Sequence, residues 1–302
     1  MRAILFGASK AGENYVSNHP DIEVVAFTDN DSAKHGTRFM GYPIIAPADI
    51  NTHDVDSIII TSQWVDQIYS QLTEEMGVDK SNIIVPTKQS VKAALPFEDN
   101  ETLAFAQSVM RTLNRYFVSH NISACLDSGT LLGAVRNKGL IPWDDDIDLA
   151  VDKDNYERLQ ASLPELYKLL NTNYDVKWNI VIITVNNIDC CINLEFSNSS
   201  HTQLVPFDIS VQRRESINGL SELLSSGGLF FAPATHFDSY EPIEFLGETF
   251  LAPFDAEGFL TFMYGHWQTP KKTTQITEYE NRRASMSAPR TGISVQKRTL
   301  CE

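Results

Sequence analysis

The hydrophobic and polar positions divide the chain into two parts with different patterns. From residue 2 to 86, short apolar runs alternate with stretches of helical length, and each run ends in small or turn-forming residues. The runs are RAILFGA, IEVVAFTD, YPIIAP, DSIIITS and NIIVP. Because they are β-rich and lack polar alternation, they predict parallel strands buried on both faces of one sheet. We therefore expect a doubly wound, Rossmann-like α/β domain.

A different pattern begins near residue 101. Large apolar side chains recur at helical spacing up to residue 120, which predicts one long helix. These side chains are Phe105, Val109, Leu113 and Phe117. A strand and a tight turn are expected in ISACLDSGTLLGAV, and the later strand candidates are 146–151, 180–185, 190–196 and 204–211. Since no second series of strand–helix–strand units follows, this part predicts an α+β domain.

These patterns set the expected domain boundaries. Residues 1–90 form the first domain, 91–100 a linker with a proline and mixed charge, and 101–272 the second domain. The remaining segment, 273–302, is polar, locally basic and mostly without periodicity. Such a composition predicts a surface extension rather than a part of the core.

Composition narrows the functional classes. The chain has 302 residues, is 42% hydrophobic and carries a formal net charge of −15. This charge argues against a nucleic-acid-binding protein, which usually presents a basic surface. No run approaches the roughly 20 apolar residues that span a bilayer, and MRAILFGAS lacks the features of a signal peptide. The four cysteines show no CxxC spacing, so neither a zinc site nor a disulfide framework is expected.

The turn after the first expected strand is similar to a dinucleotide-binding turn. In GASKAG, Gly7, Ser9 and Gly12 occupy the positions of the G-x-G-x-x-G fingerprint, and Asp29 stands where such a fold carries its ribose-binding acid. A serine replaces the middle glycine, which argues against NAD-dependent redox chemistry, although its hydroxyl and amide still suit a phosphate. Two interpretations stay open: a nucleotide or anion site, or glycines that serve the turn and its packing alone.

The stretch IPWDDDIDLAV concentrates aspartates directly before an apolar strand. Strand alternation places Asp144, Asp146 and Asp148 on one face, with Ile147 and Leu149 on the other. Unpaired carboxylates at i and i+2 would repel one another, whereas one hard cation can bind them together. A solvated loop would not need the apolar alternate residues, so the pattern favours a site for Mg²⁺ or Mn²⁺.

A small turn upstream and a further aspartate downstream extend this site. Ser128, Gly129 and Thr130 follow an expected strand, and the backbone amides of such a turn suit a phosphate. Asp208, in PFDISV, lies between apolar neighbours on a later strand. A glycine turn, then aspartates alternating with apolar residues, then a separate aspartate is the layout of the nucleotidyltransferase fold, in which three carboxylates hold one or two Mg²⁺ ions.

Basic and aromatic side chains accompany the aspartates. Arg136 and Lys138 lie between the turn and the aspartates, where they are available to offset phosphate charge; the alternative is two exposed basic residues on a loop. Trp143 is a candidate for stacking on a base or a choline-like cation, or for packing that holds the loop. Tyr264, His266 and Trp267, in YGHWQTP, are candidates for lining an acceptor pocket; for His266 the alternative is a hydrogen-bonded structural histidine.

The stretch DSGTLLGAVRNKGLIPWDDDIDLAV resembles the signature of the LicD family, which includes bacterial phosphocholine transferases and the animal fukutin proteins. The similarity covers roughly 101–272 and is most specific at 127–149; FMYGHWQTP resembles a late element of the family. Asn137 departs from the histidine that many members carry, which weakens any acid–base role there. In the first domain, AFTDNDSAKHGTRFMGYPII is similar to Rossmann-like modules of bacterial nucleotide-sugar enzymes, a resemblance that concerns fold more than activity.

The LicD resemblance implies the transfer of a phosphorylated alcohol from a CDP-activated donor to a sugar of a surface glycan or glycolipid precursor. Asp146, Asp148 and Asp208 would hold Mg²⁺ on the donor pyrophosphate, while the glycine turn would bind a phosphate. Asp144 or Asp145 would accept the proton of the attacking hydroxyl. Phosphoryl-type transfer depends mainly on positioning and charge stabilisation, so no nucleophilic side chain is required.

Several alternatives stay open. Glu195, in NLEFS, also lies between apolar residues and competes with Asp208 as the third metal ligand. A true nucleotidyltransferase would move NMP from an NTP to a sugar or sugar phosphate, and a nucleotide-sensing module would lack catalysis. The expected partners are a CDP-activated alcohol and a glycan acceptor, with a homodimer as an option. The expected location is the cytoplasm, with peripheral attachment at the inner membrane face as a variant.

Overall fold

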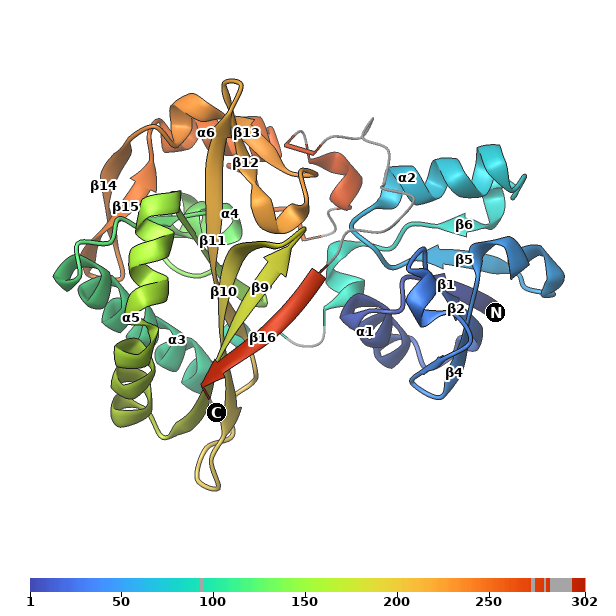
Figure 1. The fold of residues 1–302 in the computed structure, drawn as a ribbon, viewed down its shortest axis with the longest axis horizontal. Helices are drawn as coiled ribbons and strands as arrows, with labels where there is room; N and C mark the ends of the chain where they lie inside the picture. Colours follow the sequence, from blue (N-terminus) through green and yellow to red (C-terminus); the bar gives the residue numbers. More distant parts are fainter. Residues whose placement is uncertain (93–94, 273–274, 280, 283–294, 302) are drawn as a thin grey trace. The chain divides into compact units, whose positions relative to one another are not determined.

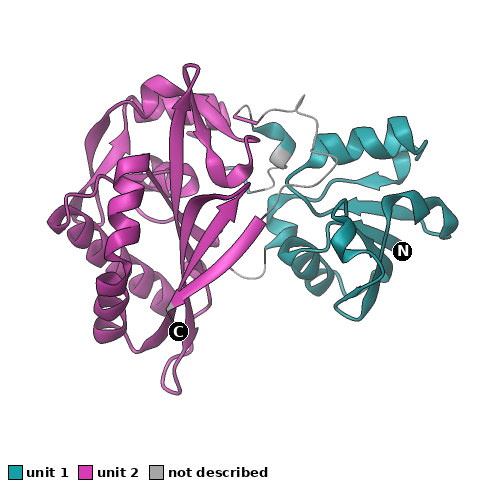
Figure 2. Ribbon diagram, viewed as in Figure 1, with its two compact units in different colours: residues 1–93, 271–279, 284–293 teal, residues 94–270, 280–283, 294–302 magenta. Residues whose placement is uncertain are grey.

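The computed structural model describes residues 1–92, 95–272, 275–279, 281–282 and 295–301. The chain forms two compact units (Figure 2). The first comprises Met1–Ala93 and parts of the segment 271–293, and the second comprises Ala94–Pro270 with the other C-terminal residues. None of the helices among the described residues combines the length and the apolar character that a membrane span requires.

The first unit is built on a six-stranded sheet with the order β3-β4-β2-β1-β5-β6 (Figure 1). Its strands are β1 (Arg2–Phe6), β2 (Glu23–Thr28), β3 (Arg38–Phe39), β4 (Tyr42–Ile45), β5 (Ser57–Ile60) and β6 (Ile83–Ile84). Neighbouring strands are parallel, except that β3 runs antiparallel to β4. The five apolar runs are therefore parallel strands, as predicted, and their order is that of a Rossmann-type sheet.

Apolar side chains of this sheet pack on both of its faces. Leu5 of β1 belongs to one buried cluster together with Tyr15 of the first helix, while Phe6 belongs to a second cluster together with Ile68 of the next helix. These helices are α1 (Lys10–Asn18) and α2 (Val65–Ser70). Burial on both faces explains why the strands lack polar alternation in the sequence. The predicted doubly wound α/β domain is confirmed.

Gly7, directly after β1, leaves no room for a side chain. Its φ is +123°, and a Cβ atom would lie 2.7 Å from the carbonyl oxygen of Thr61. We expect Gly7→Ala to lower the free energy of unfolding of the first unit by about 2 kcal/mol or more, because backbone strain and a backbone clash add. Gly36→Ala is the control, since Gly36 also has a positive φ of +76° but open space around it. Urea unfolding midpoints measure the difference, and equal losses would contradict the clash.

The second unit contains a ten-stranded mixed sheet with the main order β14-β15-β7-β8-β11-β10-β9-β16. The strands of this path are β7 (Cys125–Leu126), β8 (Asp146–Val151), β9 (Val176–Val185), β10 (Ile188–Asn198), β11 (Asp208–Ile217), β14 (Tyr240–Phe245), β15 (Glu248–Pro253) and β16 (Val295–Cys301). Two short strands, β12 (Leu220–Leu223) and β13 (Phe231–Pro233), extend the sheet from β11. The pairs β8–β11 and β7–β15 are parallel, and the remaining pairs are antiparallel.

Two long helices pack together in the core of this unit. The helices of the unit are α3 (Asn100–Ser119), α4 (Ser128–Leu132), α5 (Lys153–Asn173) and α6 (Ala256–Tyr264). Helix α3 confirms the long helix predicted from the apolar spacing. The hydroxyl of Tyr116 on α3 donates to the carbonyl oxygen of Ser162 on α5 at 2.9 Å. Both helices bury their apolar side chains in one cluster with the sheet strands, and Figure 1 shows α3 and α5 near one another.

The structure differs from the sequence predictions at three places in this unit. Residues 128–132 form the short helix α4 rather than a tight turn, because Asp127 caps the helix. The strand predicted at 204–211 begins only at Asp208; Leu204 instead exchanges backbone hydrogen bonds with the side-chain amide of Asn198, outside the sheet. Part of the polar C-terminal segment forms the edge strand β16, which no apolar pattern in the sequence indicates.

Candidate functional site

Three neighbouring strands place acidic side chains in one row. In the parallel pair β8–β11, Asp208 lies opposite Asp146, and in the antiparallel pair β10–β11, Glu195 lies opposite Asp208. Directly opposed residues point to the same face of a sheet. The aspartate predicted from the sequence and its rival, Glu195, are therefore neighbours rather than exclusive alternatives. We call the surface formed by Asp146, Asp148, Asp208 and Glu195 the acidic face.

A second row of polar side chains follows on the same face. Asp148 lies opposite Ser210, which lies opposite Asn193, and the Ser210 hydroxyl donates to Oδ1 of Asn193 at 2.9 Å. Oδ1 of Asp148 accepts a hydrogen bond from Nε2 of Gln212 at 2.8 Å. This bond holds the Asp148 carboxylate in place on the sheet.

The intervening residues of these strands point to the opposite face. Ile147 and Leu149 on β8, with Ile209 and Val211 on β11, are buried in the main apolar cluster. The alternation predicted for DIDLAV is therefore present from Asp146 onward, and the strand bounds 146–151 are confirmed. The result is a sheet with one apolar face and one face that can present several carboxylates to a ligand.

Asp144 and Asp145 lie in the loop before β8. One carboxylate oxygen each from Asp144, Asp145 and Asp146 lie within 4.8 Å of one another, a spacing at which a metal ion could bind all three. Asp144 also lies against the glycine turn, since a Cβ atom on Gly129 would be 2.1 Å from its Oδ2. The absence of a side chain at Gly129 therefore lets the loop and the turn approach closely.

The carboxylates of the acidic face disfavour the ionisation of Asp208. Burial, together with the charges of Glu195 and Asp145, raises the pKa of the Asp208 carboxyl to about 6, against the lowering effect of Lys297. Like charges held close together disfavour ionisation, and a bound cation would reverse this effect. The site thus has the electrostatic character of a cation-binding centre.

A buried ion pair holds the turn before α4. Oδ1 of Asp127 accepts the backbone N–H of Ser128 at 2.7 Å, and its Oδ2 accepts Nε of Arg214 at 2.9 Å. The Asp127 side chain is 0% exposed and that of Arg214 is 3% exposed. Ser128 has a φ of +49°, an uncommon value for a residue other than glycine. Because Asp127 does not reach the surface, it positions the turn rather than binding a ligand.

Asp127 and Arg214 were not among the site residues predicted from the sequence. The signal for Asp127 was available, because an aspartate directly before SGTLL is a typical helix N-cap. Arg214, in VQRRES, had no comparable signal, since its burial depends on which face of β11 is covered.

Thr130 connects this turn to the acidic face. Its hydroxyl oxygen accepts the backbone N–H of Asp148 at 2.9 Å, and the residue is only 3% exposed. Its side chain therefore positions the strand that carries Asp146 and Asp148. The neighbouring Ser128 and Gly129 are partly exposed, so the surface of the turn is left to them.

Removing the Thr130 hydroxyl should weaken the site through Asp148. We expect Thr130→Val to lower the free energy of unfolding by about 1–3 kcal/mol, because the buried N–H of Asp148 would lose its acceptor. Thr130→Ser keeps the acceptor and should retain most of the hydrogen-bond contribution. Thermal unfolding combined with Mg²⁺ titration measures both effects, and a valine variant as stable as the serine variant would contradict the role of the hydroxyl.

Arg136 lies in the π-helical turn Gly133–Asn137 that follows α4, and Lys138 is the residue directly after this turn. Nη1 of Arg136 donates to the carbonyl oxygen of Trp267 at 3.2 Å, and its guanidinium carbon lies 5.8 Å from the ring centroid of Trp143. Burial lowers the pKa of Arg136. Lys138 is exposed and has a left-handed backbone, with a φ of +56°. The structure therefore brings Arg136 and Trp143 together, with Lys138 at the surface.

The aromatic residues predicted to line an acceptor pocket differ in exposure. Trp267 is 7% exposed, and its Nε1 donates to Oγ1 of Thr261 at 3.1 Å, so it packs in the core. Tyr264 is partly buried against the same core, whereas His266 is exposed. His236 is buried and its Nδ1 lies 2.8 Å from the carbonyl oxygen of Phe254, which is a structural contact.

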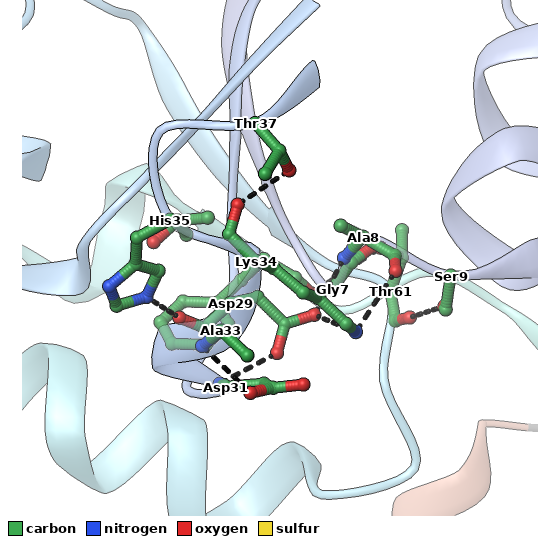
Figure 3. A network of polar contacts seen from close by, with 12 residues as sticks. Gly7, Ala8, Ser9, Asp29, Asp31, Ala33, Lys34, His35, Thr37 and Thr61 are labelled. Carbon is green, nitrogen blue, oxygen red and sulfur yellow. Dashed lines mark hydrogen bonds and ion pairs between the residues drawn. The ribbon is translucent and has the colours of Figure 1, made fainter. Parts of the chain in front are cut away.

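In the first unit, the acidic side chain near the glycine turn already has partners (Figure 3). Oδ2 of Asp29 accepts hydrogen bonds from the backbone N–H of Ala8 at 3.1 Å and from Nζ of Lys34 at 2.7 Å. Nζ of Lys34 also donates to the carbonyl oxygen of Ala8 at 3.2 Å. Lys34 thus occupies the carboxylate that a ribose would use in a dinucleotide-binding fold.

The other residues of this turn serve its packing. Ser9 is the N-cap residue of α1 without a side-chain capping bond, and its hydroxyl makes a long 3.5 Å hydrogen bond to the carbonyl oxygen of Thr61. A Cβ atom on Gly12 would lie 2.6 Å from the carbonyl oxygen of Gly7, so the helix lies directly on the turn. Both glycines are therefore required by close packing.

The site residues are of the kinds found in proteins that bind a divalent cation and a phosphate. Carboxylates on one face of a mixed sheet, a capped glycine turn beside them and a basic turn nearby form a centre suited to a divalent cation and a phosphate. Residues 121–255 match the family model described as "LicD/FKTN/FKRP, nucleotidyltransferase domain", and residues 1–84 match "C2185-like, N-terminal". The segment 121–255 is a LicD domain, as the resemblance of 127–149 predicted.

Individual relatives match smaller parts of the chain. The lipopolysaccharide cholinephosphotransferase LicD of Haemophilus influenzae is 46% identical over 61 residues, which are 19% of this chain and 23% of that protein. An uncharacterized protein of Rickettsia prowazekii is 38% identical over 73 residues, 24% of this chain and 27% of the relative. Each match thus spans about a quarter of the relative's length.

One solved structure matches part of the chain, with a low structural similarity. The UDP-D-quinovosamine 4-dehydrogenase of Vibrio fischeri is 22% identical, with a TM-score of 0.22, and the alignment covers 28% of this chain and 74% of that one. A TM-score this low carries no weight for fold or function. The assignment of the fold of the first unit rests on its own strand order.

Proposed function

We propose that the second unit is a metal-dependent transferase that moves a phosphorylated alcohol, such as phosphocholine, from a CDP-activated donor to a sugar hydroxyl of a glycan or glycolipid precursor. The observation that carries this proposal is the register that places Asp146, Asp208 and Glu195 in one row within a LicD domain. The cholinephosphotransferase named among the relatives supports the class of transferred group.

The carboxylates of the acidic face fit a hard divalent cation, because Mg²⁺ and Mn²⁺ prefer oxygen ligands. Asp146, Asp148 and Asp208 would hold Mg²⁺ or Mn²⁺, with Glu195 beside them. Asp146 also belongs to the loop cluster with Asp144 and is therefore the central ligand of the proposal. When bound, the cation would offset the charge that develops on the donor phosphates.

The remaining residues would bind the donor and move one proton. The backbone amide of Gly129 and the charges of Arg136 and Lys138 would contact the phosphates, while the amide of Ser128 stays bonded to Asp127. The oxygen of the sugar hydroxyl would form a bond to the transferred phosphorus while the bond from that phosphorus to CMP breaks. Asp145 would take the proton of the hydroxyl, since Asp144 lies against the glycine turn. These roles are positional and electrostatic, as phosphoryl-type transfer requires.

The experiment that tests this function identifies the product. ³¹P NMR is recorded on the full chain with Mg²⁺, a panel of sugar acceptors and either CDP-alcohols such as CDP-choline or NTPs. The CDP-alcohols should give a new phosphodiester together with CMP. Release of pyrophosphate from an NTP would instead support nucleotidyl transfer. Nucleotide binding without any turnover would support a sensing module with an inactive second unit.

For the first unit we propose a regulatory rather than a redox role. Asp29 is paired with Lys34, and Ser9 replaces the glycine that lets a backbone approach a pyrophosphate. A phosphate or nucleotide would then be recognised by the turn amides and Lys34 rather than by a free ribose-binding acid. Titration with NADH, followed by its fluorescence, should show no binding; saturable binding would contradict the proposal.

A further inference from the structure

The loop that follows β12 brings a serine hydroxyl to the acidic face. Its first residues form the 3₁₀ turn Leu224–Ser226, which lies against β9, β10 and β11. Continued by two residues, the antiparallel register of β11 and β12 places Ser225 opposite Gln212. The Ser225 hydroxyl donates to Oε1 of Gln212 at 2.5 Å. The loop therefore reaches the polar side chains that β11 carries on this face of the sheet.

The loop is fixed by its own hydrogen bonds and packing. Ser226 is buried; its hydroxyl donates to the carbonyl oxygen of Leu223 at 2.6 Å and accepts the backbone N–H of Phe230 at 2.9 Å. Leu229 is completely buried, and Gly227 has a left-handed backbone with a φ of +63°. Because buried neighbours hold both ends of the turn, Ser225 has a defined place although it is itself partly exposed.

The hydrogen bonds from this loop to the acidic face form a chain with one direction. Oε1 of Gln212 accepts the Ser225 hydroxyl, so the amide turns its Nε2 toward Asp148 and donates to Oδ1 at 2.8 Å. Each donor thus points toward the carboxylate, which is an acceptor only when ionised. Thr130 supports the same residue through the backbone, because its hydroxyl oxygen accepts the N–H of Asp148. One oxygen of this carboxylate therefore has a fixed amide partner.

A fixed partner on one carboxylate oxygen limits how the carboxylate can bind a cation. The hydrogen bond to Oδ1 of Asp148 opposes the rotation that would present both oxygens equally to one ion. Mg²⁺ requires near-ideal octahedral geometry with few carboxylates, whereas Ca²⁺ accepts more oxygens at longer distances and often takes both oxygens of one carboxylate. Binding through a single oxygen of Asp148 therefore favours the smaller cation.

We propose that Gln212 and Ser225 are positioning residues that restrict Asp148 to binding through one oxygen, and that they thereby make the cation centre select Mg²⁺ over Ca²⁺. This inference rests on the cation site proposed for the acidic face. Both residues act through the Asp148 carboxylate rather than as ligands. The loop after β12 thus takes part in metal selection although it contributes no carboxylate to the site.

The test measures cation binding by the full chain without any substrate. Free Mn²⁺ is followed by electron paramagnetic resonance, and Mg²⁺ and Ca²⁺ are titrated as competitors. Gln212→Met keeps the length of the side chain but removes the amide. We expect it to weaken Mg²⁺ binding about tenfold, as the loss of a hydrogen-bonding partner of a ligating carboxylate does. The affinity for Ca²⁺ should stay near that of the wild type, so the preference for Mg²⁺ should fall by nearly the same factor.

Variants of Ser225 test the loop separately. Ser225→Ala should lower the preference for Mg²⁺ about threefold, because Gln212 loses the donor that orients its amide. Ser225→Thr keeps a hydroxyl and should restore the preference. Ser221→Ala is the matched control, since the Ser221 hydroxyl is buried in β12 and has no hydrogen-bond partner among the described residues. This control should leave both affinities unchanged.

The outcomes separate this inference from the proposed reaction. If the wild type turns over no CDP-alcohol, a lowered preference for Mg²⁺ in Gln212→Met still supports the positioning role. A purely structural role would lower the melting temperature without changing the preference, and that result would overturn the inference. Tighter Mg²⁺ binding by Gln212→Met would also overturn it, because the amide would then compete with the cation, as would a wild type that binds neither Mn²⁺ nor Mg²⁺. If Gln212→Met does not fold, the alanine and threonine variants of Ser225 decide by the same criterion.

Discussion

Asp146→Asn should reduce turnover of the proposed reaction by roughly 10³-fold or more and abolish Mg²⁺-dependent binding of CDP. Asp146 belongs to two groups of carboxylates: it lies opposite Asp208 on the sheet, and it clusters with Asp144 and Asp145 of the preceding loop. Its replacement by the neutral amide keeps the shape of the side chain but removes one charge from the centre of both groups. The expected loss is therefore in cation affinity rather than in folding.

Asp208→Asn should give the same loss of turnover but a more stable metal-free protein. Because the folded-state pKa of Asp208 is raised from 3.8 to about 6, its stabilising effect is present below pH 3.8 and is lost as the pH rises through about 6. At neutral pH the ionised carboxylate therefore destabilises the fold. Its partial exposure reduces the effect, and we expect a gain of about 1–2 kcal/mol from the asparagine.

These two variants are checked by turnover, Mg²⁺ titration and thermal unfolding in the presence of EDTA at pH 4 and pH 7.5. Asp154→Asn, an exposed position in the first turn of α5, is the control for loss of one negative charge and should retain full turnover. The stability gain of Asp208→Asn should disappear near pH 4. Full turnover by Asp146→Asn, or a lower melting temperature for Asp208→Asn at pH 7.5, would exclude the proposed role of the acidic face.

The elements that could be predicted from the sequence are those with a local signal. Strand β8 was predicted with its bounds because carboxylates and apolar residues alternate in DIDLAV, and α3 because apolar residues recur at helical spacing. The parallel strands of the first unit have continuous apolar runs for the same physical reason, burial on both faces. Each of these signals lies within a single element.

Features that depend on register between distant strands could not be predicted in this way. The sequence around Glu195 and Asp208 is similar in pattern, and only the pairing of β10 with β11 shows that the two are neighbours. Strand β16 is polar and exposed, so its place beside β9 follows from backbone pairing and from the ion pair of Arg298 with Asp189, neither of which the sequence pattern indicates. Asp29 matches the position of a ribose-binding acid in the G-x-G-x-x-G fingerprint. Its ion pair with Lys34 could not be predicted, because it involves Lys34 of the 3₁₀ turn Ser32–Lys34, which is not part of the fingerprint.

The second large effect is expected at the buried pair of Asp127 and Arg214, in stability. Arg214→Met should lower the free energy of unfolding of the second unit by about 3–5 kcal/mol, because it leaves the Asp127 carboxylate buried without its charged partner. Asp127→Asn keeps a side chain that can cap α4 and removes only the charge, and it should cost a similar amount. The double variant should cost much less than the sum of the two, since neither charge is then left alone.

A surface pair provides the comparison for this cycle. Arg115 forms an ion pair with Glu248 but is 72% exposed, so Arg115→Met should cost less than about 1 kcal/mol. Urea unfolding monitored by far-UV circular dichroism measures all four variants. Similar losses from Arg214→Met and Arg115→Met would contradict the role of burial.

The pair of Asp127 and Arg214 is also connected to the acidic face. Asp127 caps helix α4, and Thr130 of this helix accepts the backbone N–H of Asp148. Variants that still fold should therefore bind Mg²⁺ more weakly, whereas loss of a remote ion pair would leave that affinity unchanged.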